Sequence, residues 1–314
     1  MSITRLVRRV IALGTAIVVG ACSSAPPPAR PVFSPITERA APETLPGKIV
    51  WHDLLTHDTE AAQEFYGDLF GWSFENSREA PGRYWDIKHE GRTIASMLAV
   101  ARDEVDSPLW LVSVSVVDVD GTASRASELG ATINAEPSEL PNRGRYAVLE
   151  DLQGAFLVLL RSSSGDPPDG GEVASGAWLW SELWTTDAAA AVSFYEGLLG
   201  YRSKTIAARL ADTPEDASGE SVDGEESPAV FYAMYRDDSV RAGIHQLPSE
   251  AVSYWLPYVA VRDVSGMAAR AEELGGKVLL PPEAVRNGEA AILVDPTGAP
   301  FGIQEWPRAE GGDR

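Results

Sequence analysis

WHDLLTHDTEAAQEFYGDLFGW, residues 51–72, recurs 129 positions later as WSELWTTDAAAAVSFYEGLLGY, residues 180–201. The two stretches share an initial tryptophan, an aspartate seven positions later, a Phe-Tyr pair and a closing glycine. A match of this length at a constant offset indicates that the chain contains two copies of one structural module.

Two further blocks repeat in the same order. Residues 110–131 match residues 255–276 at an offset of 145, and EDLQGAF at 150–156 matches VDPTGAPF at 294–301. The larger offset indicates an insertion of sixteen residues in the second copy, which we place in the stretch 207–228. The middle of this insert holds seven acidic residues and no basic one, a composition that favours a solvated loop.

Each block shows the same order of local signals. A strand rich in Trp, Leu and Val at 49–56 leads to Asp58, which can cap a helix, and apolar residues then fall at helical spacing as far as Gly71. Short strand-like runs follow, and the order recurs in the second half of each copy. The pattern predicts an α+β fold of four βαβββ units, two in each module.

The string D-x-x-x-A-x-x-F-Y-x-x-L-x-G at 58–71 and 187–200, with the D-P-x-G turn at 295–298, resembles the vicinal oxygen chelate superfamily. That superfamily contains glyoxalases, bleomycin-resistance proteins and dioxygenases. The resemblance covers about residues 48–306 and implies two tandem glyoxalase/bleomycin-resistance-like modules. Because two paired units of this family curl into a cup around a ligand, it also implies two cups.

The first 22 residues carry the signals of an exported lipoprotein. Three arginines precede a twelve-residue apolar run, too short to span a bilayer, that ends in Val19-Gly20-Ala21-Cys22. This tetrapeptide resembles a bacterial lipobox, in which Cys22 takes the lipid. The alternative is an ordinary signal peptide with an incidental cysteine.

The N-terminal signals predict a protein tethered to the cell envelope, on the outer-membrane and periplasmic side if the cell is Gram-negative. A Pro- and Ala-rich stretch suits the tether. Together with the repeat, these signals predict five segments: a signal peptide at 1–22, a tether at 23–47, a first module at 48–162, a linker at 163–176 and a second module at 177–307.

The charge balance restricts the partners. The formal net charge is −20, and loss of the three N-terminal arginines would make it more negative. An acidic surface repels nucleic acid and anionic lipid, so we expect no nucleic-acid partner and membrane contact through the lipid anchor only. The single cysteine excludes an internal disulfide, and the oligomeric state is left open.

The resemblance implies where metal ligands would stand. Metal enzymes of the family carry His or Glu on the first strand of each unit and Glu on the last strand. Counted from the matching aspartates, these positions fall on side chains that cannot bind a metal ion: Trp51, Trp180, Leu111, Leu256, Val158 and Gly302. We therefore expect no metal and no other cofactor in either cup.

The four histidines offer few alternative metal ligands. His52 and His57 are five residues apart and face opposite ways on an extended chain, and His89 precedes a hairpin signal that predicts exposure. His245 could meet Glu182 in the second cup. That pair leaves a divalent metal at a displaced site as the alternative, although two ligands rarely suffice.

Asp53 and Glu182 occupy the same position in the two copies and share strand parity with Trp51 and Trp180. A carboxyl group on an aromatic wall could act as a general base or bind a ligand, which makes these two acids the candidate catalytic residues. The structural alternative is a carboxylate that accepts hydrogen bonds at the sheet edge. The parity argument gives these candidate ligand-binding residues: Trp51, Asp53, Trp180, Glu182, Trp184, His245, Tyr258 and Gln304.

Three functions fit the sequence. The leading interpretation is an envelope-anchored, metal-independent protein that binds a small, partly aromatic or hydrophobic ligand. The alternatives are a glyoxalase- or dioxygenase-like lyase or oxidoreductase with a displaced metal site, and an envelope scaffold protein with vestigial cups. Only the second copy carries the acidic insert, Trp184 and His245, so we expect a surviving site there.

Overall fold

The chain folds as four consecutive βαβββ units, which confirms the predicted α+β architecture. The computed structural model describes residues 33–306 except 39, 42, 79, 171–172, 208–229 and 286–287. The first two units contain β1 (Ile49–Thr56), α2 (Thr59–Phe70), β2 (Ser73–Asn76), β3 (Tyr84–His89), β4 (Arg92–Ala99), β5 (Leu109–Ser115), α3 (Val119–Glu128), β6 (Thr132–Leu140), β7 (Gly144–Glu150) and β8 (Phe156–Ser162). The last two contain β9 (Trp178–Thr185), α4 (Ala188–Leu199), β10 (Arg202–Ala207), β11 (Val230–Arg236), β12 (Ser239–Gln246), β13 (Tyr254–Val261), α5 (Val264–Glu273), β14 (Lys277–Val285), β15 (Gly288–Val294) and β16 (Pro300–Glu305).

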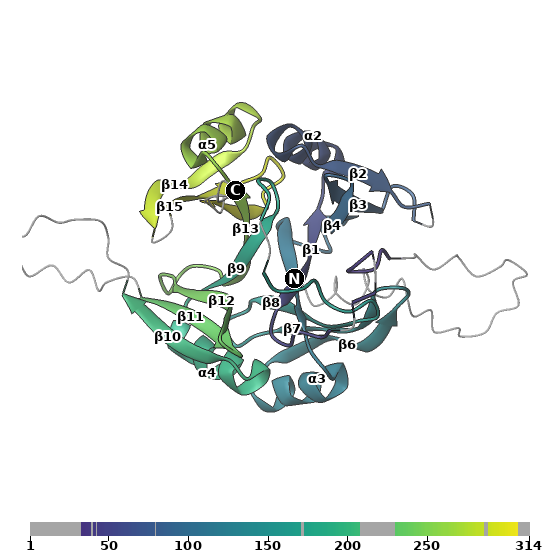
Figure 1. Ribbon diagram of the computed structural model, residues 1–314, viewed down its shortest axis with the longest axis vertical. Helices are drawn as coiled ribbons and strands as arrows, with labels where there is room; N and C mark the ends of the chain where they lie inside the picture. Colours follow the sequence, from purple (N-terminus) through teal and green to yellow (C-terminus); the bar gives the residue numbers. More distant parts are fainter. Residues whose placement is uncertain are drawn as a thin grey trace, which may run out of the picture.

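Each module forms one eight-stranded mixed sheet. The strand orders are β2-β3-β4-β1-β5-β8-β7-β6 and β10-β11-β12-β9-β13-β16-β15-β14, so the two sheets have the same topology. In each sheet the first strands of the two units pair antiparallel at the centre, β1 with β5 and β9 with β13. The two sheets curve back to back, with their concave sides facing away from each other (Figure 1).

All four helices of the described residues begin at an aspartate. Asp58, Asp118, Asp187 and Asp263 each accept a hydrogen bond from the backbone N–H three residues further along. This contact satisfies one of the amide groups that a helix start leaves without a partner. Gly71 and Gly200 end α2 and α4 in the left-handed conformation that glycine adopts without a steric penalty.

The helices also form the contact between the modules. α2 lies beside α5 at one end of the molecule, and α3 lies beside α4 at the other (Figure 1). Each pair closes over a buried apolar cluster to which both modules contribute. The face of each sheet that carries the helices is therefore buried against the other module, and the opposite, concave face is the one left for a ligand.

A buried polar chain crosses from one module to the other. Trp255 Nε1 donates to the Tyr195 hydroxyl at 3.3 Å, and this hydroxyl donates to Asp151 Oδ2 of the first module at 2.9 Å. In the other copy, Trp110 Nε1 donates to the Tyr66 hydroxyl at 2.9 Å, and the charge of Asp295 raises the pKa of Tyr66 further above the value set by burial. The tyrosine of each repeat motif thus faces the turn aspartate of the other copy.

Three predicted segments fall wholly or partly outside the described residues. The signal peptide at 1–22 lies outside them entirely, the tether at 23–47 is described from residue 33 except for residues 39 and 42, and only residue 207 of the insert at 207–228 is described. Within the described part of the chain, no helix is long and apolar enough to cross a membrane.

The buried chain predicts a stability effect. In Tyr195→Phe, Asp151 Oδ2 loses its donor and the Trp255 indole loses its acceptor, so we expect the free energy of unfolding to fall by about 1–3 kcal/mol. Urea denaturation measures the change. Tyr235→Phe, at a half-buried position on β11, is the matched control and should stay within about 0.5 kcal/mol of wild type. Equal losses in the two variants would contradict the proposed role of the chain.

Candidate functional site

The candidate residues of the second module lie together on its concave face. Trp180, Glu182 and Trp184 alternate along β9, so all three point to one side of the sheet. Tyr258 on β13 stands opposite Trp180, and Gln304 on β16 completes the group through its contact with the same tryptophan. We call the site built by these five residues the second cup.

Glu182 is the polar centre of the second cup. Its Oε2 accepts hydrogen bonds from the Tyr258 hydroxyl at 2.7 Å and from Trp184 Nε1 at 2.9 Å. Its side chain is only 7% exposed, and burial raises the pKa of Glu182 against the lowering effect of these two donors. A carboxyl group of this kind takes up a proton more readily than an ordinary glutamate, and can then donate a hydrogen bond as well as accept one.

The walls of the second cup are aromatic. The half-buried Trp180 ring lies 5.8 Å from the Tyr258 ring and 6.0 Å from the Phe231 ring, and its Nε1 donates to Gln304 Oε1 at 3.0 Å. Phe231 fits because its neighbour is a glycine: a Cβ atom at Gly243 would lie 2.7 Å from the Phe231 ring. Sequence analysis missed Phe231, although alternation along β11 could have indicated it.

His245 does not join Glu182. It pairs with Trp184 in the sheet register, and its ring stacks on that indole at a centroid distance of 4.6 Å. Burial lowers the pKa of His245, which favours the neutral ring. Among the described residues, no group of three or more His, Cys, Asp or Glu side chains is placed to hold a metal ion.

The side chains at the family's ligand positions do not fit a divalent ion. A Cβ atom at Gly302 would lie 2.3 Å from the Tyr258 ring, so this ring occupies the place where the family's glutamate side chain would begin. In the first module, Trp51, Leu111 and Val158 lie within one buried apolar cluster. None of these groups offers a metal-binding oxygen or nitrogen in that place.

The first module holds the counterpart of Glu182 in a different setting. Asp53 Oδ1 accepts hydrogen bonds from Ser96 Oγ at 2.6 Å and from Trp51 Nε1 at 3.2 Å. Burial raises the pKa of Asp53, and the positive charge of Arg143 partly offsets this rise. Arg143 is itself 3% exposed and was missed by sequence analysis, because it lies in a turn between β6 and β7 whose direction no periodicity reveals.

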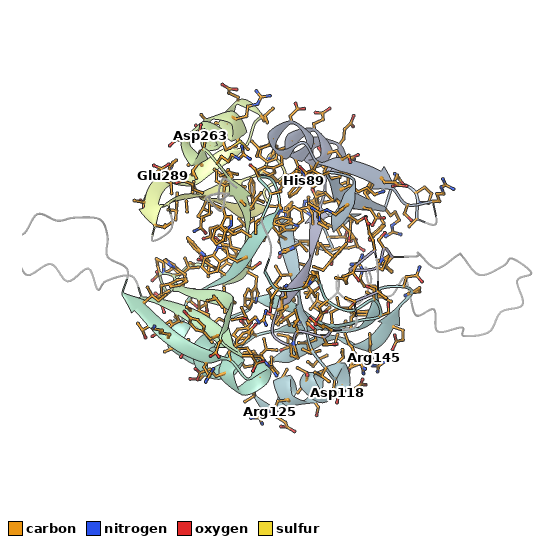
Figure 2. The ribbon with its side chains drawn as sticks, in the orientation of Figure 1. His89, Asp118, Arg125, Arg145, Asp263 and Glu289 are labelled. Atoms are coloured by element: carbon orange, nitrogen blue, oxygen red, sulfur yellow. The ribbon has the colours of Figure 1, made fainter. Side chains whose placement is uncertain are left out.

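The other three histidines belong to the scaffold. His52 stacks on Trp178 at 4.2 Å, and burial between the modules lowers its pKa to about 3. His57 Nε2 lies 2.7 Å from the Val105 carbonyl oxygen. The prediction that His89 is exposed is wrong: this residue, labelled in Figure 2, is buried against the linker, with Nε2 3.0 Å from the Ser175 carbonyl oxygen.

The two concave faces differ in exposure. Ala135 on β6 is 8% exposed, whereas Leu280, at the equivalent place on β14, is 43% exposed. Val285 at the end of β14 is 41% exposed. The second cup thus has an open apolar rim, and the first does not.

Both modules match known families. Residues 48–159 match the Glyoxalase/Bleomycin resistance protein/Dioxygenase superfamily, and residues 181–304 match the Glyoxalase-like domain. The chain therefore belongs to the glyoxalase/bleomycin resistance protein/dioxygenase superfamily, which confirms the resemblance found in the repeat.

Whole-length relatives share the tandem arrangement. The anthracycline biosynthesis protein DnrV of Streptomyces peucetius is 30% identical over 292 residues, which cover 85% of this chain and 98% of that protein. Among solved structures, the Mn(II)-bound glyoxalase from Novosphingobium aromaticivorans is 14% identical, with a TM-score of 0.54 and 83% of each chain covered. The 2,2',3-trihydroxybiphenyl 1,2-dioxygenase of Sphingomonas wittichii strain RW1 is 12% identical, with a TM-score of 0.56, covering 84% of this chain and 92% of that one. At such identities the structures support the fold alone.

The buried acid predicts a pH dependence. Because the pKa of Glu182 is raised above its ordinary value of 4.5 in the folded protein, the folded state binds more protons than the unfolded state between these two values. The free energy of unfolding should therefore fall as the pH rises through this window, by at most about 1.4 kcal/mol per pH unit for one proton. Glu182→Gln should remove this contribution. Denaturation curves recorded from pH 4 upward measure this contribution to the free energy of unfolding. Glu283→Gln, at an exposed position on β14, is the control. Parallel stability profiles against pH for wild type and Glu182→Gln would contradict the prediction.

Proposed function

We propose that the protein binds a small, partly aromatic or hydrophobic ligand in the second cup without a metal ion. The observation that carries this proposal is the arrangement of Trp180 and Tyr258 around the buried Glu182, beside the exposed apolar rim at Leu280. The rings offer a flat apolar surface, and the carboxyl group and Gln304 offer polar groups that can orient a ligand. Such a site is mostly apolar, with a few fixed polar groups, as small-molecule sites generally are.

The raised pKa of Glu182 supports a ligand with a hydroxyl or carbonyl group. A protonated Glu182 can donate to a carbonyl oxygen, and an ionised one can accept from a hydroxyl group. The ionised form is not left as a buried charge without a partner, because Tyr258 and Trp184 already donate to Oε2. The name of the relative DnrV, an anthracycline biosynthesis protein, is consistent with a role in small-molecule chemistry.

The enzyme alternative is less well supported. A metal-dependent lyase or oxidoreductase would need a displaced site, and the second cup supplies only Glu182 and His245, which are directed to different partners. The ring of Tyr258 blocks the usual glutamate position. The binding function needs no such rearrangement.

Ligand binding can be tested directly. We expect some aromatic compounds from a screening library to quench the tryptophan fluorescence. For each confirmed ligand, Trp180→Ala should lower the binding affinity by about tenfold or more, measured by calorimetry. A tenfold loss corresponds to only about 1.4 kcal/mol of lost contact free energy. Trp306→Ala, which removes a 37%-exposed tryptophan outside the second cup, is the matched control. A protein that binds nothing across the library would favour the scaffold function instead.

Metal analysis of the purified protein separates the binding and enzyme functions. We expect no stoichiometric divalent ion. A stoichiometric ion that is lost in both Glu182→Ala and His245→Ala would overturn metal independence and support the enzyme.

We also propose that the protein is anchored to the cell envelope through a lipid on Cys22. The support is the lipobox-like sequence and the position of the single cysteine directly after the apolar run. Cys22→Ser should move the protein from the membrane fraction to the soluble fraction and abolish labelling with a radioactive fatty acid. Ser23→Ala is the control and should leave both unchanged. A Cys22→Ser protein that stays in the membrane fraction would contradict lipidation.

A further inference from the structure

The described N-terminal residues, from residue 33 on, lie on the concave side of the first sheet (Figure 1). Ile36 is only 6% exposed and belongs to the apolar cluster of Trp51, Leu111 and Val158. No helix residue belongs to this cluster, so it lies on the sheet face opposite the helices. We call this site the first cup. Ile36 fills the place in which a ligand of the first module would sit.

Polar groups hold the segment at residues 33–37. Arg143 Nε donates to the Ser34 carbonyl oxygen at 2.6 Å, and its guanidinium group lies 5.9 Å from the Phe33 ring centroid and 4.0 Å from that of Trp51. Ser34 Oγ donates to Asp86 Oδ2 at 2.5 Å. Arg143 therefore joins the segment to the wall of the first cup through both a hydrogen bond and cation–π contacts.

The path of the chain beyond Ile36 is also fixed. Thr37 Oγ1 donates to the Ser164 carbonyl oxygen at 2.8 Å, and the Ala41 amide donates to the same oxygen at 2.7 Å. The amide of Leu45 donates to Asp166 Oδ2 at 2.6 Å. These bonds hold the stretch against the segment that follows β8, so the insertion of Ile36 is not an isolated contact.

The second copy lacks the residues that hold the segment. The Tyr84 hydroxyl accepts from Arg143 at 3.0 Å, and its ring lies 5.2 Å from that of Phe33. In the register of the strands, Tyr84 and Asp86 correspond to Phe231 and Ala233. The offset of 144 between β7 and β15 aligns Arg143 with an asparagine in the sequence. Among its described residues, the second copy thus lacks the counterparts of Tyr84 and Asp86.

We infer that residues 33–37 are a built-in peptide ligand of the first cup and that they exclude small molecules from it. The protein would then offer one small-molecule site per chain, although it contains two cups. This inference rests on the proposed function only in taking the second cup as the open one. Because twelve residues join Ile36 to β1, the local concentration of the segment is about millimolar, and even a weak contact keeps it docked.

The test counts sites for a neutral apolar dye, Nile red, which the negative charge of the protein does not repel. Wild type should bind one dye per chain, and the full-length Ile36→Asp protein should bind two. Val252→Asp, at a 75%-exposed position, is the matched control and should match wild type. In Ile36→Asp combined with Trp180→Ala, the site of the first cup should keep its affinity, and that of the second cup should weaken by about tenfold or more. If the second cup binds no dye, wild type should bind none and Ile36→Asp should bind one dye per chain. Failure of the proposed function is thus distinguishable from failure of this inference.

Hydrogen exchange of the amides in residues 33–38 reports whether the segment has left the first cup. If Ile36→Asp alone leaves them protected, Ile36→Asp with Arg143→Gln removes both the apolar and the polar contacts. Fast exchange without an additional dye site would overturn the inference, and so would protection that survives in the double variant.

A peptide competition completes the test. A synthetic peptide of residues 31–46, added at up to about millimolar concentration, should displace the additional dye from Ile36→Asp protein. The same peptide carrying Ile36→Asp should not displace it. Displacement by both peptides, or by neither, would show that the first cup does not recognise this segment.

Discussion

The buried face between the modules is the constraint on which the rest of the structure depends. Each sheet carries its helices on one side, and that side is covered by the other module. Buried polar groups need partners, and at this contact Trp255 donates to Tyr195, which donates to Asp151 of the other module. The Phe-Tyr pair and the D-x-x-G turn thus stay alike in both copies because they hold the modules together, and neither reaches a concave face.

Because the shared residues serve the contact, the concave faces are free to differ. Asp53 and Glu182 stand at one repeat position, yet their neighbours set different environments. The shorter Asp53 is reached by Ser96, whereas Gly243 at the equivalent place lets Phe231 pack beside the longer Glu182. One cup became a site for the protein's own chain, and the other kept an aromatic wall with an open rim. The two copies share one backbone fold, and residue differences on their concave faces give the two cups different surroundings.

The sequence predicted the parts of the fold that depend on local signals. Repeat offsets, aspartate caps and strand alternation led to four βαβββ units and placed Trp180, Glu182 and Tyr258 on one face. Sequence analysis failed where the deciding contact is distant along the chain. His89 looked exposed beside a hairpin turn, but it is buried by the linker, and Arg143 and Ile36 meet only after folding. A Pro- and Ala-rich stretch favours a free tether by composition. Composition does not reveal that Ile36 within it packs into the first cup.

Gly302 shapes the polar centre of the second cup. A glycine there leaves room for the Tyr258 ring, and the Tyr258 hydroxyl then donates to Glu182 from the neighbouring strand. The carboxyl group of the second cup therefore lies between two aromatic donors. Restoring a ligating glutamate would force the ring aside and leave Glu182 with one donor fewer in a buried setting, which costs about 1–3 kcal/mol. The aromatic wall of the second cup thus occupies the space that a longer side chain at position 302 would need.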